Sequence, residues 1–259
     1  MINYKVEVYS NKNSIAIDKT NEDHAFFDDN SCIGMVLDGV TRDRENDIYP
    51  DPSPARVATR IFAHAALSEA EEEDAIGINK IKKMIQKGSE EVRSYNAKLK
   101  HRFPAGLVGV VFMIEEDVFY YGYIGDCYAA IIRQGFKRPF TECQTEMIKK
   151  HKKEYTSDEI RFEICNHINH PYGYGVWDGN ERAMDFVKYG AISLADEDVI
   201  LICTDGMRDE LKNQDLHKLL SDPLEWLDNG GENKDDRTCI RLSFNNDFTR
   251  QIVYNREKK

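Results

Sequence analysis

The sequence has no run of about 18 apolar residues, the shortest stretch from which a helix could cross a bilayer. Residues 1–6, Met-Ile-Asn-Tyr-Lys-Val, also lack the basic segment and apolar core of a secretory signal. We therefore expect a soluble, cytoplasmic protein with no membrane partner.

Positive charge is scarce as well. The chain has 35 Lys and Arg residues against 46 Asp and Glu residues, a formal net charge of −11. A protein that binds the nucleic-acid backbone needs a basic face to displace counterions, so nucleic acid is not expected as a partner. Hydrophobic residues make up 41% of the 259 residues, which excludes a disordered chain and allows one large domain or two small ones.

The cysteines form no CxxC pair, and several lie in apolar runs. There are six: Cys32, Cys127, Cys143, Cys165, Cys203 and Cys239. We expect buried thiols in a reducing compartment rather than a disulfide or zinc framework. His167 and His170 have no cysteine at ligand spacing, so they do not favour zinc either.

Short apolar segments bounded by Asn, Asp and Gly predict strands early and late in the chain, with two helices between them. Ser53 and Pro54 supply an N-cap and a first helical residue. The expected strands are 4–9, 14–17, 32–37, 107–114, 118–124, 128–133, 199–203 and 238–244, and the expected helices are 55–64, 78–99, 207–211 and 215–220. This order predicts an α+β fold with antiparallel sheets.

The segment of about 140–190 is polar and has no long period, and we interpret it as an appended flap. Within it, residues 172–177 read Tyr-Gly-Tyr-Gly-Val-Trp. The glycines permit hinge motion, and the aromatic residues either contact a protein substrate or anchor the flap to the core.

Aspartates recur where apolar strands end or begin. Asp38, Asp126 and Asp205 follow apolar runs, and Asp235 precedes the last predicted strand. Each alone is compatible with an ordinary turn. Together they predict carboxylates gathered at one edge, where a divalent cation would offset their repulsion, and all-oxygen ligation favours Mg²⁺ or Mn²⁺.

Five motifs resemble, in order and spacing, those of the metal-dependent protein phosphatases, the PPM or protein phosphatase 2C family. They are Asn21-Glu22-Asp23, Val36-Leu37-Asp38-Gly39-Val40, residues 123–129 (Tyr-Ile-Gly-Asp-Cys-Tyr-Ala), residues 201–207 (Leu-Ile-Cys-Thr-Asp-Gly-Met) and Asp235-Asp236-Arg237-Thr238. The resemblance extends over residues 1 to about 245. It implies a bacterial-type single domain over 1–259, a four-layer αββα sandwich of two antiparallel sheets flanked by helices.

The resemblance also implies roles for individual residues at a centre of two Mn²⁺ or Mg²⁺ ions. Asp38 would bridge both metals, with the Gly39 carbonyl on one of them. The resemblance further implies Asp205 and Asp235 as ligands of the first metal, and Asp126 with Asp205 as ligands of a third, weaker ion. Glu22 and Asp23 would serve the second metal directly or through water. Asp38, Asp205 and Asp235 would thus carry the catalysis.

The implied reaction is attack of a water, activated by two metals about 3.5–4 Å apart, on a phosphomonoester. The resemblance therefore implies a phosphoserine/phosphothreonine phosphatase in signalling, with a phosphorylated protein as its partner and a monomeric state.

Three positions depart from the family pattern. Asp18 stands where many members carry a phosphate-binding arginine, and Val40 stands where some carry a histidine. The stretch 104–108 lacks the usual threonine pair. Lys19 and Arg42 are the remaining candidates to bind the substrate phosphate.

These departures keep two other hypotheses open. One is a catalytically impaired relative that keeps the fold as a binding or scaffolding protein. The other is a metal-dependent hydrolase of a small phosphorylated molecule.

Overall fold

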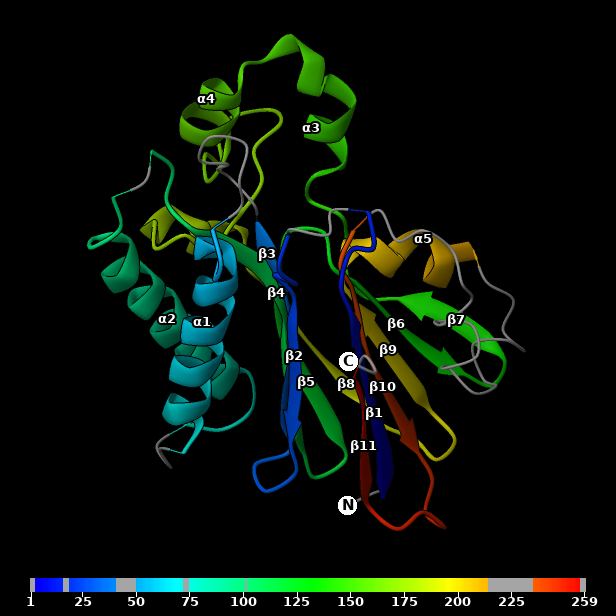
Figure 1. Ribbon diagram of the computed structural model, residues 1–259. Helices are drawn as coiled ribbons and strands as arrows, with labels where there is room; N and C mark the ends of the chain where they lie inside the picture. The colour runs from blue at the N-terminus through cyan, green and yellow to red at the C-terminus, as the bar shows by residue number, and fades with distance from the viewer. Residues whose placement is uncertain are drawn as a thin grey trace.

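Two β-sheets pack face to face, and helices cover their outer faces (Figure 1). The computed structural model describes residues 3–15, 19–40, 50–71, 75–100, 102–213 and 235–256. In spatial order, the six-stranded sheet contains β11 (Gln251–Arg256), β1 (Tyr4–Asn11), β10 (Arg237–Phe244), β9 (Val199–Cys203), β6 (Tyr128–Arg133) and β7 (Phe136–Pro139). The five-stranded sheet contains β2 (His24–Asp28), β3 (Ile33–Val40), β4 (Gly106–Glu115), β5 (Val118–Ile124) and β8 (Lys188–Ser193).

The helices complete a four-layer αββα arrangement. Helices α1 (Pro54–Ala70) and α2 (Gly77–Asn96) pack on the five-stranded sheet, and α5 (Asp205–Asn213) packs against β9 and β10 of the other sheet. The predicted α+β sandwich is therefore confirmed. One detail is wrong, because β11 pairs with β1 in parallel and the sheets are only mostly antiparallel.

Apolar side chains fill the space between the sheets. Tyr4 on β1 meets Phe27 on β2 edge to face, with ring centroids 5.5 Å apart. Phe27 in turn stacks on Phe112, and Phe112 stacks on Phe119. The Tyr4–Phe27 contact joins the two sheets, and the stacked rings continue it across the inner face of the five-stranded sheet.

The predicted helix signals are confirmed. The Ser53 hydroxyl accepts the Arg56 N–H at 3.2 Å, and Pro54 begins α1. Helix α2 buries one apolar stripe, which includes Ile81, Met84, Ile85 and Val92. The predicted helix over 215–220 lies outside the described residues.

The second predicted strand is wrong in the part that is described. Ser14 and Ile15 form a bend. The Ile15 N–H donates to the Asn13 side chain at 2.8 Å, and the Asn13 N–H donates to Asp236 at 2.8 Å. One local and one distant side-chain acceptor thus take the amides that a strand ladder would use. Strands β2, β7, β8 and β11 are additions that we did not predict.

Strand β3 continues past its predicted end. Pairing with β4 runs through Asp38 opposite Val108, Gly39 opposite Leu107 and Val40 opposite Gly106. Asp38 therefore projects from a paired strand rather than from a turn, so its backbone is held on one side by the sheet.

The flap (residues 140–190) consists of short helices and loops: α3 (Glu146–His151), η1 (Lys152–Glu154), α4 (Ser157–Glu159), η2 (Ile160–Ile164) and η3 (Glu181–Phe186). Trp177 is fully buried and stacks on Phe62 of α1 at 4.6 Å. Its backbone exchanges two hydrogen bonds with Leu107. Trp177 therefore anchors the flap to the core. The single-domain organisation of the chain stays a prediction.

Two smaller expectations concern the cysteines and membrane spans. The six cysteines are thiols, and all except the partly exposed Cys143 are buried, as predicted. Within the described ranges, no helix is both long and apolar enough to cross a membrane.

Candidate metal and phosphate site

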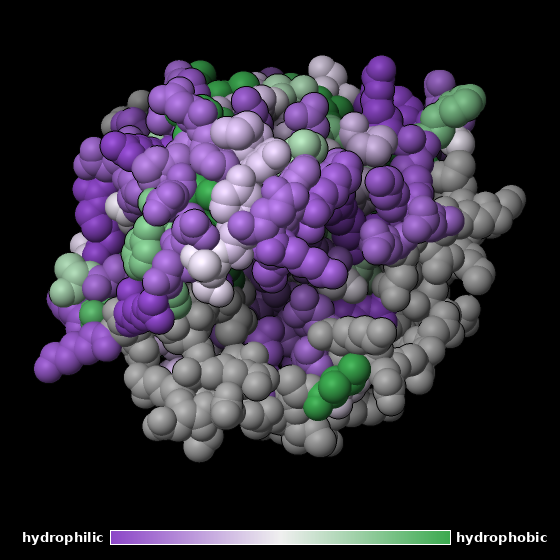
Figure 2. Space-filling view, turned by 90° about the horizontal axis from the view of Figure 1, so that it is seen from above, coloured by the Kyte–Doolittle hydropathy of each residue, from purple (hydrophilic) through white to green (hydrophobic). Residues whose placement is uncertain are grey.

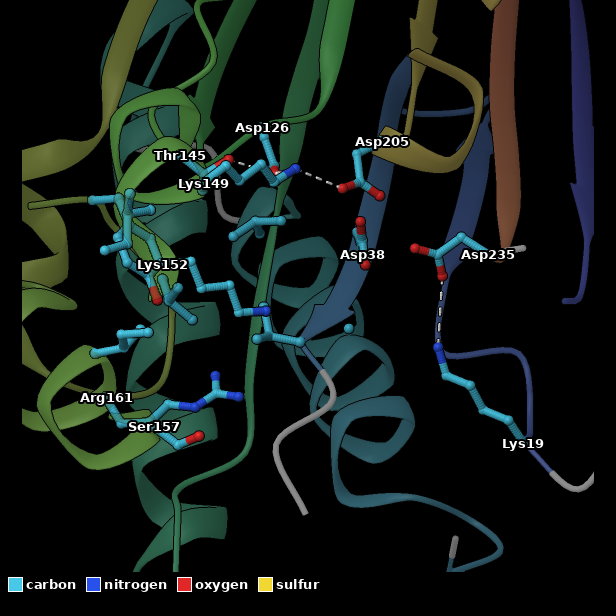
Figure 3. A pocket seen from close by; sticks show the side chains of 17 residues that line it. Lys19, Asp38, Asp126, Thr145, Lys149, Lys152, Ser157, Arg161, Asp205 and Asp235 are labelled. Atoms are coloured by element: carbon cyan, nitrogen blue, oxygen red, sulfur yellow. Dashed lines mark hydrogen bonds and ion pairs between the residues drawn. The ribbon is translucent and has the colours of Figure 1, made fainter. Parts of the chain in front are cut away.

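Four of the predicted aspartates line one pocket of about 420 Å³ at an end of the sandwich (Figure 3). Asp38 comes from β3, Asp126 from the β5–β6 turn, Asp205 from the start of α5 and Asp235 from the entry to β10. Gly39 and Lys19 line the same pocket. Flap helices α3 and α4 lie above this end (Figure 1), and the molecule seen from there is mostly hydrophilic (Figure 2).

Glu22 and Asp23 lie just before β2 and are almost fully buried. They are not among the residues that line the pocket. The Ser53 hydroxyl donates to Glu22 Oε1 at 2.5 Å, and the Thr204 hydroxyl donates to Asp23 Oδ2 at 2.8 Å. Hydroxyl groups from other parts of the chain therefore fix both carboxylates by hydrogen bonds.

Asp236 connects the acidic segment, Glu22 and Asp23, to the start of β10. Its Oδ1 accepts the Asn13 N–H at 2.8 Å, and its Oδ2 accepts the Glu22 N–H at 2.9 Å. Asp236 is 3% exposed and is not among the residues that line the pocket. It acts as a positioning residue, whereas its neighbour Asp235 faces the pocket.

Two glycines permit the close packing on which this geometry depends. A Cβ on Gly206 would lie 2.0 Å from the Asp236 carbonyl oxygen. A Cβ on Gly39 would lie 2.9 Å from the Glu22 carbonyl oxygen. Any larger residue would push α5 away from the start of β10, or Glu22 away from β3.

Desolvation and mutual repulsion make the charged carboxylates unfavourable. Burial, followed by repulsion from Asp23 and Asp205, raises the pKa of Asp38 well above its usual range. Burial is also the main cause that raises the pKa of Asp23 and the pKa of Asp205. A nearby cation would remove this penalty.

The donor set fits a hard divalent ion, because the predicted ligands are carboxylate oxygens and one carbonyl oxygen. In the described ranges, no three His, Cys, Asp or Glu side chains already form a metal cage. The site is therefore a set of repelling carboxylates on fixed elements, and the side chains have to close around an ion to bind it.

Two lysines already offset part of the negative charge. Lys19 Nζ lies 3.3 Å from Glu22, 3.6 Å from Asp236 and 3.7 Å from Asp235. Lys149 Nζ donates to Asp126 Oδ2 at 2.8 Å and to Asp205 Oδ2 at 3.1 Å. Figure 3 shows the two lysines approaching the aspartates from opposite sides.

The flap contributes further cations to the pocket. Lys152 and Arg161 line it opposite the aspartates, together with Ser157 (Figure 3). The Arg161 guanidinium also lies over the Phe103 ring, 5.7 Å from its centroid. A pocket with carboxylates on one wall and cations on the other suits a metal-bound anion such as a phosphate.

Sequence reasoning located most of the acidic residues but not those that support them. Lys149, Lys152, Ser157 and Arg161 were read only as parts of a polar segment, and Ser53 only as a helix cap. Asp236 belongs to the motif Asp235-Asp236-Arg237-Thr238, but nothing in the sequence indicates that its side chain is buried. Arg42, a predicted phosphate ligand, lies outside the described residues.

Solved structures similar to this one are phosphatases. The Mycobacterium tuberculosis serine/threonine phosphatase PstP/Ppp is 15% identical, with 95% of this chain and 100% of that chain covered and a TM-score of 0.71. The PstP catalytic domain in complex with two manganese ions is 14% identical, with coverage of 95% and 100% and a TM-score of 0.67. The PPM Ser-Thr phosphatase MsPP from Mycobacterium smegmatis, in complex with cacodylate, is 14% identical, with coverage of 92% and 97% and a TM-score of 0.60.

These likenesses show that the chain has the fold of PPM phosphatases over almost its whole length. No family model matches the sequence. No curated protein matches it either. At such low identity, function has to be argued from the residues of the site.

Proposed function

We propose that this protein is a metal-dependent phosphatase that hydrolyses phosphoserine and phosphothreonine in proteins. One observation carries the proposal: four aspartates from four separate elements line a single pocket, and the PPM resemblance implies metal ligation for all four. The flap cations on the opposite wall supply what a phosphate dianion needs.

Asp38, Asp205 and Asp235, together with the Gly39 carbonyl, would hold two Mn²⁺ or Mg²⁺ ions, and Glu22 and Asp23 would support the second ion from behind the pocket. When bound, such ions lower the pKa of a water nucleophile and offset the charge on phosphoryl oxygens. The chain's own residues fix the geometry: β3 pairing holds Asp38, and the α5 start holds Asp205.

Cationic side chains beside and opposite the four pocket aspartates would orient the phosphate. Arg161 and Lys152 approach from the flap, and Lys19 approaches beside Asp235. Lys19 is engaged with three carboxylates on the aspartate side of the pocket, and the flap cations add positive charge on the other side. Arg42 stays a further prediction.

We also propose a cytoplasmic, monomeric enzyme. The six thiols suit a reducing compartment, where structural disulfides are rare. The negative net charge argues against a nucleic-acid partner.

The decisive experiment is hydrolysis of p-nitrophenyl phosphate after metal removal by EDTA, with Mn²⁺, Mg²⁺ or Zn²⁺ added back. We expect Mn²⁺ or Mg²⁺ to restore turnover in the wild type and Asp205→Asn to reduce it by about 100-fold or more. Asp209→Asn is the matched control, because Asp209 is an exposed residue on the same helix.

Folded protein with no turnover in any metal would overturn the proposal and favour a catalytically impaired binding protein. Turnover of small phosphorylated metabolites but not of phosphopeptides would overturn only the assigned substrate class.

A further inference from the structure

Lys149 lies between two carboxylates that come from different strand ends. Its ammonium group contacts Oδ2 of Asp126 at 2.8 Å and Oδ2 of Asp205 at 3.1 Å. The Thr145 hydroxyl donates to the same Asp126 oxygen at 2.7 Å. Within the described part of the chain, the side chains that donate to these two oxygens both belong to the flap.

The two aspartates are also the pair to which the resemblance assigns a third, weaker metal ion. A metal there would need the oxygens that Lys149 Nζ and Thr145 Oγ1 now engage. Asp126, Asp205 and Lys149 line the same pocket, so a cation bound to both carboxylates would lie directly beside the ammonium group. The two carboxylates already have a positive partner.

We propose that Lys149 is a built-in cation that replaces the third metal ion, so that the chain binds two divalent ions and not three. This inference rests on the proposed function, because it concerns the metal content of the same site. The ammonium keeps Asp126 and Asp205 together, as an ion would. Being part of α3, it also ties the flap to the metal-binding wall.

A lysine side chain is charged at neutral pH, and here its ammonium group lies at hydrogen-bond distance from two carboxylates. Its stem is half exposed, so shortening it removes little buried surface and leaves the core intact.

The test is a count of Mn²⁺ bound per chain, measured by equilibrium dialysis with metal analysis and by native mass spectrometry. We expect two ions for the wild type and three for Lys149→Met, which keeps the length of the stem but removes the charge. Lys150→Met is the matched control and should bind two ions. Lys150 is on the same helix and pairs with Glu146 instead.

A double variant separates a third ion at this position from one elsewhere. Adding Asp126→Asn to Lys149→Met should return the count to two, because the released carboxylate pair is lost again. Lys149→Ala repeats the test with a shorter side chain.

Three ions in the wild type would overturn the inference, as would two ions in both Lys149 variants. A third ion that persists in the double variant would overturn it too. A wild type that binds no Mn²⁺ would instead overturn the proposed metal centre, so the two failures are distinguishable.

Discussion

Replacing Asp236 by alanine tests how the acidic segment is held against the sandwich. The carboxylate is buried and accepts two backbone N–H groups, those of Asn13 at 2.8 Å and Glu22 at 2.9 Å. Alanine leaves both amides without this acceptor, at a cost of about 1–3 kcal/mol each. The loss is partly offset, because Asp236 also repels Asp23 and contributes to its raised pKa. We expect the free energy of unfolding to fall by about 2–4 kcal/mol.

Asparagine at this position removes the charge and one of the two hydrogen-bond acceptors. Asp236→Asn keeps one acceptor oxygen and turns the other into a donor that faces an N–H group. We therefore expect about half the loss seen with alanine. The assay is denaturant unfolding of the metal-free protein at neutral pH. Mn²⁺ affinity should fall about tenfold in the alanine variant, because Glu22 loses its support.

Asp196→Ala is the control for removal of an aspartate. Asp196 is exposed and accepts a single N–H, that of Asn246 at 2.9 Å. Its loss should change stability by less than about 0.5 kcal/mol. If Asp236→Ala is as mild as this control, the two buried hydrogen bonds do not hold the segment and our account of the site is refuted.

Two further predictions concern pH and substrate binding. Because burial raises the pKa of Asp38 and of Asp23, the folded protein holds their protons at pH values where the unfolded chain has lost them. Metal-free protein should therefore lose stability as pH rises above about 4, and Asp38→Asn should show a shallower loss in unfolding measured across pH; equal slopes would contradict this. Arg161→Glu should raise KM for a phosphopeptide about tenfold with a much smaller change in kcat, because the guanidinium lines the pocket across from the aspartates. The exposed Arg138→Glu should leave KM unchanged, and an equal effect of both variants would show that only general charge matters.

The parts of the fold that the sequence predicted are those where one local rule decides the outcome. The helix that begins at Ser53 and Pro54 follows from a cap and a fixed φ angle, and the buried strand 199–203 follows from its apolar run. Strand β11 has no such signal. Its segment pairs in parallel with β1, and this partner is almost the whole chain away.

The residues of the site also fall into those that the sequence predicts and those that it does not. Aspartates that follow apolar strands are placed by the sheet, so their gathering at one edge could be predicted from the sequence. Lys149 could not, because nothing in its own segment says which carboxylates it reaches; the flap has to fold back over the strand ends first. Asp235 lines the pocket and Asp236 does not, and nothing in the sequence distinguishes these two adjacent aspartates.

Two different kinds of contact attach the flap to the rest of the protein. At its end, Trp177 is fully buried against Phe62 and hydrogen-bonded to Leu107, so this attachment involves the core and is insensitive to charge. Near its start, hydrogen bonds from the neutral groups of Thr145 and Gln144 are joined by the ion pairs of Lys149 with Asp126 and Asp205. These ion pairs respond to whatever binds the two carboxylates. A metal ion bound by these aspartates would therefore act on α3 and on Lys152 and Arg161 after it, while the Trp177 anchor would stay fixed.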